Sequence, residues 1–280
     1  MFRTNGSRVR RAIGSLITAG LVVLALSLEP AAPVAAGPLE DGVVAYGRGD
    51  YATALRLMRP LAEQGNPSAQ AMLGLMHALG RGVKQDSAAA LTWYRKAADQ
   101  GFASAQSDLG SMYDQGFGVK QDYAAALTWY RKAADQGFAG AEYNLGLMYA
   151  NGKGVPKDSK AAVTWFRKAA DHGDAIAQFS LGLIYANGEG VPQDFTAAVT
   201  WYRQAAERGF ADAQYNLGSM YGSGKGVPQD YVMAHMWLDL AVAGGSQEAL
   251  QDREVVERRM TPAQIAEAQK LARERKPRSN

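Results

Sequence analysis

A period of 36 residues is the feature that most constrains what this chain can fold into. All five tryptophans follow this spacing, and Leu-Gly pairs recur with the same period. The tryptophans are Trp93, Trp129, Trp165, Trp201 and Trp237, and the pairs begin at Leu73, Leu109, Leu145, Leu181 and Leu217. A fixed period between about 20 and 50 residues is typical of repeat architectures. The chain is therefore predicted to be an array of similar structural units.

Each unit carries the pattern of two helices. In the unit that spans residues 141–173, three residues recur along one face of a first helix: Ala141, Leu145 and Tyr149. We expect Gly152 to end this helix, Asp158 to cap a second helix, and Gly173 to follow that helix's end. Trp165 is expected to fill the volume between neighbouring hairpins. Because one hairpin cannot bury its apolar face, stacking of hairpins is required.

The repeated string resembles the Sel-one-like repeat, a relative of the tetratricopeptide repeat with a longer loop between its helices. The pattern A-x-x-x-L-G-x-x-Y-x-x-G-x-G-V-x-x-D-x-x-x-A-x-x-W-[YF]-x-x-A-A-x-x-G fits residues 105–137, 141–173 and 177–209. The first unit departs from it at His77, and the last ends in Trp237-Leu238. The resemblance implies an all-α, right-handed α-solenoid of tandem helix-turn-helix repeats. Members of the family are mostly adaptors, scaffolds and regulators without chemistry of their own.

The first 36 residues have the pattern of a secretory signal peptide. Four arginines precede an apolar run from Ala12 to Leu28, and Val34-Ala35-Ala36 offers small residues for cleavage. The alternative is an uncleaved anchor, because 17 apolar residues (12–28) reach the lower limit for a spanning helix. The chain has no cysteine, which excludes a lipoprotein anchor. We expect an exported protein, periplasmic or secreted, with anchoring as the less favoured outcome.

The remaining boundaries follow the period. A short glycine-containing segment leads into the array at residues 37–49, and residues 50–65 copy only a second helix, as an N-terminal half-repeat cap. Five repeats occupy residues 66–245, two amphipathic capping helices are expected within residues 246–275, and residues 276–280 are expected to be a disordered tail.

Charge and cysteine content exclude several classes of function. The first 36 residues hold four of the 30 basic and one of the 27 acidic residues, so the remaining chain has no net charge. The basic footprint that nucleic-acid binding needs is therefore missing. Arg95, Arg131, Arg167 and Arg203 are spaced at the repeat period, but each has an acidic residue four positions later. We interpret this row as a solvated face with weak ion pairs.

Motifs that imitate chemistry do not nominate an active site. Gly222 to Gly226 looks like part of a phosphate loop, but it follows a helix and lacks the Ser or Thr that would hold magnesium. His77, His172 and His235 lie far apart without zinc-site spacing. No catalytic residue, metal site or cofactor is predicted, and the chain is not expected to be an enzyme.

A binding surface is expected where the repeats differ, because packing positions must recur. The resemblance implies that first helices line a concave groove. Candidate partner-binding residues there are an aromatic ladder with polar flanks: Tyr143, Phe179, Tyr215, Asn151, Asn187, Asp212 and Ser219. Such a ladder suits a peptide, loop or helix of another protein. The alternative is that the aromatic residues pack between adjacent first helices.

The sequence therefore favours a non-catalytic adaptor, scaffold or regulator that binds another protein in the bacterial periplasm or cell envelope. Two alternatives remain open. One is a β-lactam-binding or β-lactam-hydrolysing enzyme like cysteine-rich relatives, which the absence of cysteine disfavours. The other is a carbohydrate-binding scaffold, for which exposed aromatic residues are also suitable.

Overall fold

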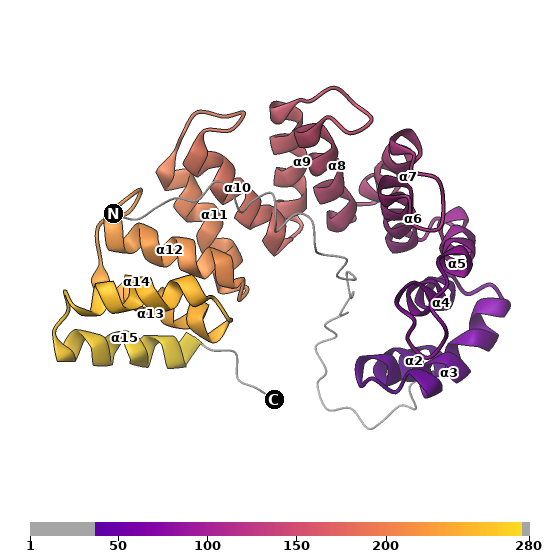
Figure 1. Ribbon diagram of the computed structural model, residues 1–280, viewed down its shortest axis with the longest axis horizontal. Helices are drawn as coiled ribbons and strands as arrows, with labels where there is room; N and C mark the ends of the chain where they lie inside the picture. The colour runs from indigo at the N-terminus through magenta and orange to yellow at the C-terminus, as the bar shows by residue number, and fades with distance from the viewer. Residues whose placement is uncertain (1–36, 276–280) are drawn as a thin grey trace. The chain divides into compact units, whose positions relative to one another are not determined.

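The computed structural model describes residues 37–275, and this part of the chain contains fourteen α-helices and no strand (Figure 1). The predicted signal peptide and the predicted tail, residues 276–280, lie outside the described residues. None of the described helices is long and apolar enough to cross a membrane.

The helices alternate as first and second members of hairpins. The first helices are α2 (Pro38–Gly47), α4 (Pro67–Leu79), α6 (Ala103–Gln115), α8 (Ala139–Asn151), α10 (Ala175–Asn187), α12 (Ala211–Ser223) and α14 (Gln247–Glu257). The second helices are α3 (Tyr51–Glu63), α5 (Ser87–Asp99), α7 (Tyr123–Ala134), α9 (Ser159–Asp171), α11 (Phe195–Glu207), α13 (Tyr231–Ala243) and α15 (Pro262–Arg275).

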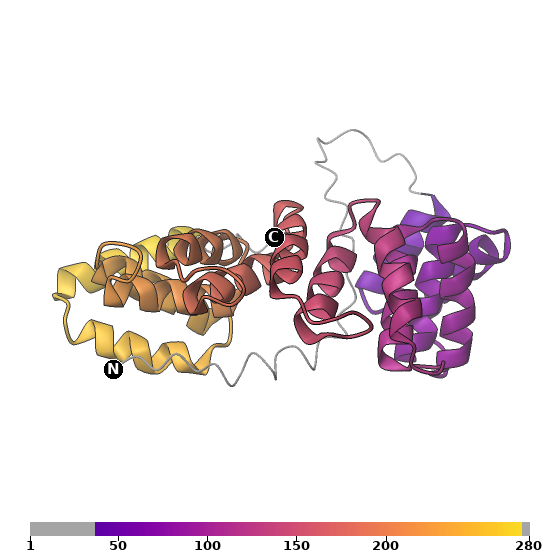
Figure 2. The ribbon, with the colours of Figure 1, turned by 90° about the horizontal axis from the view of Figure 1, so that it is seen from above.

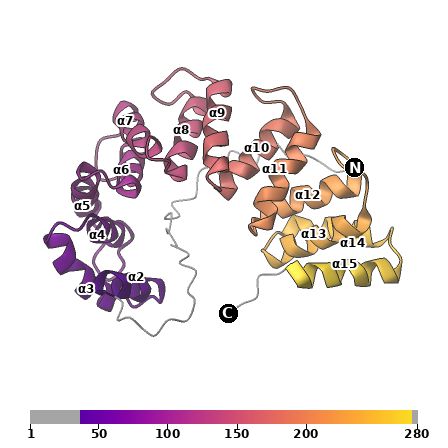
Figure 3. The ribbon, with the colours of Figure 1, turned by 180° about the vertical axis from the view of Figure 1, so that it is seen from behind.

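Contacts divide the chain into two compact units, and the division falls inside α8. We call residues 37–145 the N-terminal unit and residues 146–275 the C-terminal unit. In the N-terminal unit α2 to α7 pack in chain order, each against the next (Figure 2). In the C-terminal unit α9 to α14 do the same, and α15 packs on α13 (Figure 3). Each unit is thus a stack of helical hairpins.

The helix ends confirm the predicted hairpin. Asp158 caps α9, and its carboxylate accepts hydrogen bonds from the backbone N–H groups of Lys160 and Ala161 at 2.9 and 3.0 Å. Gly152, directly after α8, has a φ of +70°, a conformation that glycine adopts without steric cost. The second glycine of each loop has another role. A Cβ at Gly118 would lie 2.6 Å from the Ser87 carbonyl oxygen, because this loop packs on the start of the preceding second helix.

The core between the helices of a hairpin is formed by the residue that follows each tryptophan. Tyr130 is 2% exposed and lies against Gly110, and Phe166 is 4% exposed and lies against Gly146. Trp165 itself is half-buried, and the Lys168 ammonium lies 4.2 Å from the centre of its ring. The tryptophans are predicted to lie between neighbouring hairpins, and Trp93 and Trp129 do pack on buried clusters that include residues of the preceding hairpin. The contact inside the hairpin belongs to the residue after the tryptophan.

The segment 37–49, predicted to be a short entry segment before a half-repeat cap, contains α2. This helix packs on α3, so residues 38–63 form a complete hairpin. A Cβ at Gly42 would meet the Met58 side chain at 2.7 Å, as one at Gly74 would meet Tyr94. Gly42 and Met58 are 16 positions apart, whereas Gly74 and Tyr94 are 20 apart. The shorter loop shifts α2 out of the 36-residue period, which is why the period missed it.

The C-terminal helices are present where the sequence predicts them. α15 begins with Pro262 after Thr261, and Thr261 and Gln264 form a reciprocal capping box: the Gln264 side chain accepts from the Thr261 backbone N–H at 2.9 Å. Ala268 and Ala272 of α15 are buried in the cluster that also contains Trp237. Trp237 is 2% exposed, unlike the other tryptophans, and the Arg275 guanidinium lies 5.1 Å from its ring centre.

Candidate functional site

The first helices differ from the second helices in charge. No lysine or arginine occurs in α2, α4, α6, α8, α10 or α12. The second helices α3 to α11 carry arginine or lysine in every case, for example Arg56 in α3 and Arg203 in α11. Acidic residues do occur on the first helices, among them Glu40, Asp108 and Asp212. The first helices from α2 to α12 therefore carry no basic side chain, whereas α14 carries Arg253.

The first helices combine one recurring and one variable position. Their five repeated leucines are at most 1% exposed: Leu73, Leu109, Leu145, Leu181 and Leu217. The residue directly before each leucine is half-buried and changes along the chain: Met72, Asp108, Asn144, Ser180 and Asn216. In each unit we call the surface around these positions the first-helix face of that unit. Packing fixes the leucine, whereas the preceding position is free to vary.

Phe179, a predicted binding residue, is packed among aromatic side chains. Its ring is tilted against Tyr202 at 5.9 Å and against Phe210 at 5.1 Å between ring centres. Tyr202 is 3% exposed, and Phe179 packs on the buried cluster to which it belongs. This geometry agrees with the packing alternative for the aromatic ladder at this position.

Tyr215, Ser219 and Asp212 lie near α14. The Ser219 hydroxyl donates to Asp252 Oδ2 at 3.5 Å, and Tyr215 packs on a buried cluster that includes residues of α14. Burial, with Asp252 nearby, raises the pKa of Tyr215 to about 12. The pKa of Asp212 is also raised, first by partial burial and then by the negative charge of Glu248. These side chains form one polar cluster between α12 and α14.

The other predicted residues are not part of that cluster. Asn151 and Asn187 are exposed at the ends of α8 and α10. The Asn151 side-chain amide donates to the Leu147 carbonyl at 2.9 Å, and that of Asn187 donates to Glu189 Oε1 at 3.1 Å. Tyr143 is half-buried on α8, in the N-terminal unit. A role for the predicted residues in binding stays a prediction.

Asp108 on α6 is a residue that the sequence reasoning missed. Protein atoms surround its carboxyl group on most sides, although part of the residue's surface remains exposed, and this burial raises the pKa of Asp108 to about 7. The negative charge of Asp108 in turn contributes to raising the pKa values of Tyr94 and Tyr130. The sequence signal that could have revealed Asp108 is its repeat position, where the other units carry residues such as Met72, Ser180 and Asn216.

The row of arginines on the second helices has partners that the sequence did not predict. The Arg95 guanidinium donates to the Tyr113 hydroxyl at 2.6 Å, and that of Arg203 donates to the Tyr221 hydroxyl at 2.9 Å. Each bond joins a second helix to the first helix of the next hairpin. The Arg203 bond is partly buried and links adjacent hairpins, whereas Arg95 and its bond are exposed, in agreement with the predicted solvated face.

His235 is fully buried in α13. Its Nε2 lies 2.8 Å from Glu257 Oε1, and the Arg253 guanidinium donates to Asp239 Oδ1 at 2.7 Å. This network joins α13 to α14. At the same repeat position α5, α7, α9 and α11 carry Leu91, Leu127, Val163 and Val199, so the exchange to histidine is specific to α13 among these helices. No group of three or more histidines or acidic residues within residues 37–275 is arranged to hold a metal ion.

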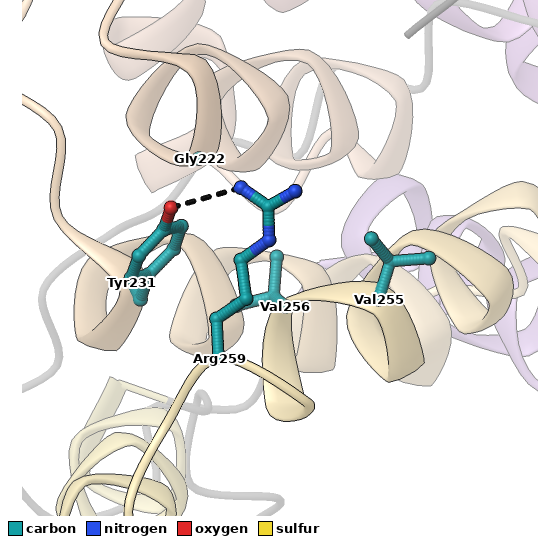
Figure 4. A pocket seen from close by; sticks show the side chains of 5 residues that line it. All are labelled: Gly222, Tyr231, Val255, Val256 and Arg259. Carbon is teal, nitrogen blue, oxygen red and sulfur yellow. Dashed lines mark hydrogen bonds between the residues drawn. The ribbon is translucent and has the colours of Figure 1, made fainter. Parts of the chain in front are cut away.

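A small crease lies between α12, α13 and α14 (Figure 4). Its lining is Gly222, Tyr231, Val255, Val256 and Arg259. The Arg259 guanidinium donates to the Tyr231 hydroxyl at 3.0 Å across it. A Cβ at Gly222 would lie 3.7 Å from both Ala234 and Val256. The missing methyl group at Gly222 therefore accounts for part of the crease.

Comparison with known proteins connects this geometry to a family. Six consecutive segments match the Sel1 repeat: residues 39–66, 67–102, 103–138, 139–174, 175–210 and 211–246. The first of these includes most of α2, in agreement with a complete first hairpin. No curated protein matches the chain.

Solved structures give the same result. A Sel1 repeat protein from Oxalobacter formigenes is 35% identical with a TM-score of 0.72, and the match covers 84% of this chain and 99% of that one. The c5321 protein, described as a protective antigen of uropathogenic Escherichia coli strains with an SLR fold, is 34% identical with a TM-score of 0.71. That match covers 85% of this chain and 53% of c5321, so the chain spans about half of its length. The immunity protein Pa5087 from Pseudomonas aeruginosa, 22% identical with a TM-score of 0.54 and coverage of 78% and 84%, shares the fold.

Proposed function

This chain belongs to the Sel1 repeat family, and on that premise we propose that it is an exported, non-catalytic scaffold or regulator that binds another protein in the bacterial periplasm or cell envelope. Sel1 repeat proteins generally mediate protein–protein interaction. Its fold class is the predicted one, an all-α solenoid of tandem helical hairpins. The export step rests on the signal-peptide pattern of residues 1–36.

The partner binds to the first-helix face. The observation that supports this surface is the contrast between the recurring leucines and the variable residues beside them. Leu181 and Leu217 are fully buried and alike, whereas Ser180 and Asn216, one position earlier, are half-buried and differ. A surface that served packing alone would keep the same residues in each hairpin. A surface that recognises one irregular partner needs different groups at successive hairpins.

The experiment is affinity capture of the tagged chain from its native envelope. One variant carries Ser180→Arg and Asn216→Arg on the first-helix face, and a control carries Thr164→Arg and Thr200→Arg on exposed positions of second helices. Both variants must retain the helical signal and the melting curve of the wild type. We expect wild type and control to retain the same specific protein and the face variant to lose it. Equal capture by all three would contradict binding through this face.

A further inference from the structure

Asp108 is the one acidic side chain at the variable position between α4 and α12, where the others are Met72, Asn144, Ser180 and Asn216. The next aspartate in this register is Asp252 on α14, which receives a hydrogen bond from Ser219. The Asp108 carboxyl group has no hydrogen bond or ion pair to any residue in 37–275, and burial is the sole cause of its altered proton affinity. It is thus a partly desolvated acid without a partner.

The surroundings of Asp108 offer no compensating charge. The helices that pack on α6 are α5 and α7, and none of their basic side chains, Arg95, Lys96, Arg131 and Lys132, forms an ion pair with Asp108 or lowers its pKa. The side chains that sense its charge include Tyr94 and Tyr130, and the Tyr130 hydroxyl is already within 3.0 Å of the Ser111 hydroxyl. A carboxylate in such a place interacts more strongly with an added cation than an exposed carboxylate does, because the local dielectric constant is lower.

Apolar side chains occur at corresponding positions of the preceding first helices, and Leu75 of α4 packs on the buried cluster that contains Leu109 of α6. Met72 and Leu75 of α4 are three positions apart on one side of that helix, and both are only partly buried. Val43 of α2 is 40% exposed. The face therefore combines partly exposed apolar surface with one unpaired carboxylate. This combination is complementary to an amphipathic segment that carries a positive charge beside its apolar side chains.

We propose that the first-helix face of the N-terminal unit binds an amphipathic segment of a partner protein, and that an arginine or lysine of this segment pairs with the Asp108 carboxylate. The proposal rests on the proposed function and specifies the class of partner. The apolar side chains of the segment lie on Met72 and Leu75. The cationic group forms charge-assisted hydrogen bonds to the carboxylate, which fix the register of the segment.

The test is selection of a random twelve-residue peptide library on the folded full chain, on Asp108→Asn and on Asp99→Asn. Asp99 is an exposed residue of the second helix α5, so its variant has the same net charge as Asp108→Asn. We expect wild type and Asp99→Asn to enrich apolar peptides with a lysine or arginine at a fixed position. We expect Asp108→Asn to lose that preference.

A selected peptide then allows the contribution of its positive charge to the binding affinity to be measured. Replacing its arginine by citrulline, which has nearly the same shape without charge, should weaken binding to wild type by about tenfold, a usual effect for a charged hydrogen bond. On Asp108→Asn the two peptides should differ by less than twofold. If the peptides selected on Asp108→Asn contained lysine or arginine at the fixed position as often as those selected on wild type, the pairing with the Asp108 carboxylate would be overturned. Neutral peptides from wild type would overturn it but leave the proposed function intact, and a failure to enrich any peptide would contradict both.

Discussion

The Tyr130 ring lies directly on the backbone of Gly110: a Cβ at this glycine would come within 2.7 Å of Tyr130 Cδ1. The same relationship joins Gly74 to Tyr94 and, with phenylalanine, Gly146 to Phe166. The Leu-Gly pair of the repeat thus places a buried leucine next to a site where an aromatic ring touches the helix backbone. The close approach of the two helices in each hairpin depends on it.

Gly110→Ala is expected to destabilise the protein by about 1–3 kcal/mol, although alanine favours a helix, because the added methyl group overpacks the contact with Tyr130. Gly222→Ala is the matched control, since the new methyl group would meet Ala234 and Val256 at 3.7 Å. It should stabilise the protein by about 1 kcal/mol. Urea denaturation midpoints measure both. Destabilisation of equal size in the two variants would show that the close contact is not the cause.

Phe166→Ala should lower the free energy of unfolding by about 3–5 kcal/mol, because it empties a buried aromatic site. Trp165→Ala should cost less, about 1–2 kcal/mol, since this side chain is half-buried. Denaturation followed by circular dichroism avoids the loss of the tryptophan signal. If Trp165→Ala lowered the free energy of unfolding more than Phe166→Ala does, the tryptophan would be the more important packing residue.

Asp108 should make stability depend on pH. Its pKa is raised from 3.8 to about 7, so between these values the folded protein binds a proton that the unfolded chain releases. Stability from this group is therefore fully present below about pH 3.8, falls as the pH rises from there to about 7, and is lost above that value. Asp108→Asn should raise the denaturation midpoint more at pH 8 than at pH 5. If the denaturation midpoint of Asp108→Asn changed between pH 5 and pH 8 by as much as that of the wild type, Asp108 would not be the cause of the pH dependence.

Tyr221→Phe should destabilise the C-terminal unit by about 1 kcal/mol, because it removes the partly buried hydrogen bond from Arg203. Tyr113→Phe removes the corresponding bond from Arg95 at an exposed site, where water replaces it. Its effect should remain below about 0.5 kcal/mol. Thermal melting of both variants provides the comparison, and the reverse order would argue against a joining role for the buried bond.

Much of the fold could be predicted because packing positions must recur. Leu145, Gly152 and Asp158 have a fixed role in every hairpin, so their 36-residue period reveals helices, loops and caps together. Helix α2 escaped this reasoning because its loop is shorter, which moves Gly42 out of the period without changing its contact with Met58. Spacing alone also could not separate Trp165 from Phe166, since adjacent residues of one helix share the period.

The candidate site was predictable only in outline. The expectation that binding lies where repeats differ directed attention to the first helices, but the aromatic residues drew it to Phe179, which packs on Tyr202. Asp108 has an unremarkable residue type for a helix surface. Its lack of a partner depends on which groups the neighbouring helices bring close, and this is visible only after the helices are packed.

The most direct test of protein binding through the first-helix face is site-specific photocrosslinking in the native envelope. A photoreactive amino acid replaces Asn216 on α12 or, as a control, Thr200 on the exposed side of α11. We expect a discrete adduct with one protein from position 216 and none from position 200. An adduct from position 200 alone, or no adduct from position 216, would contradict binding through this face.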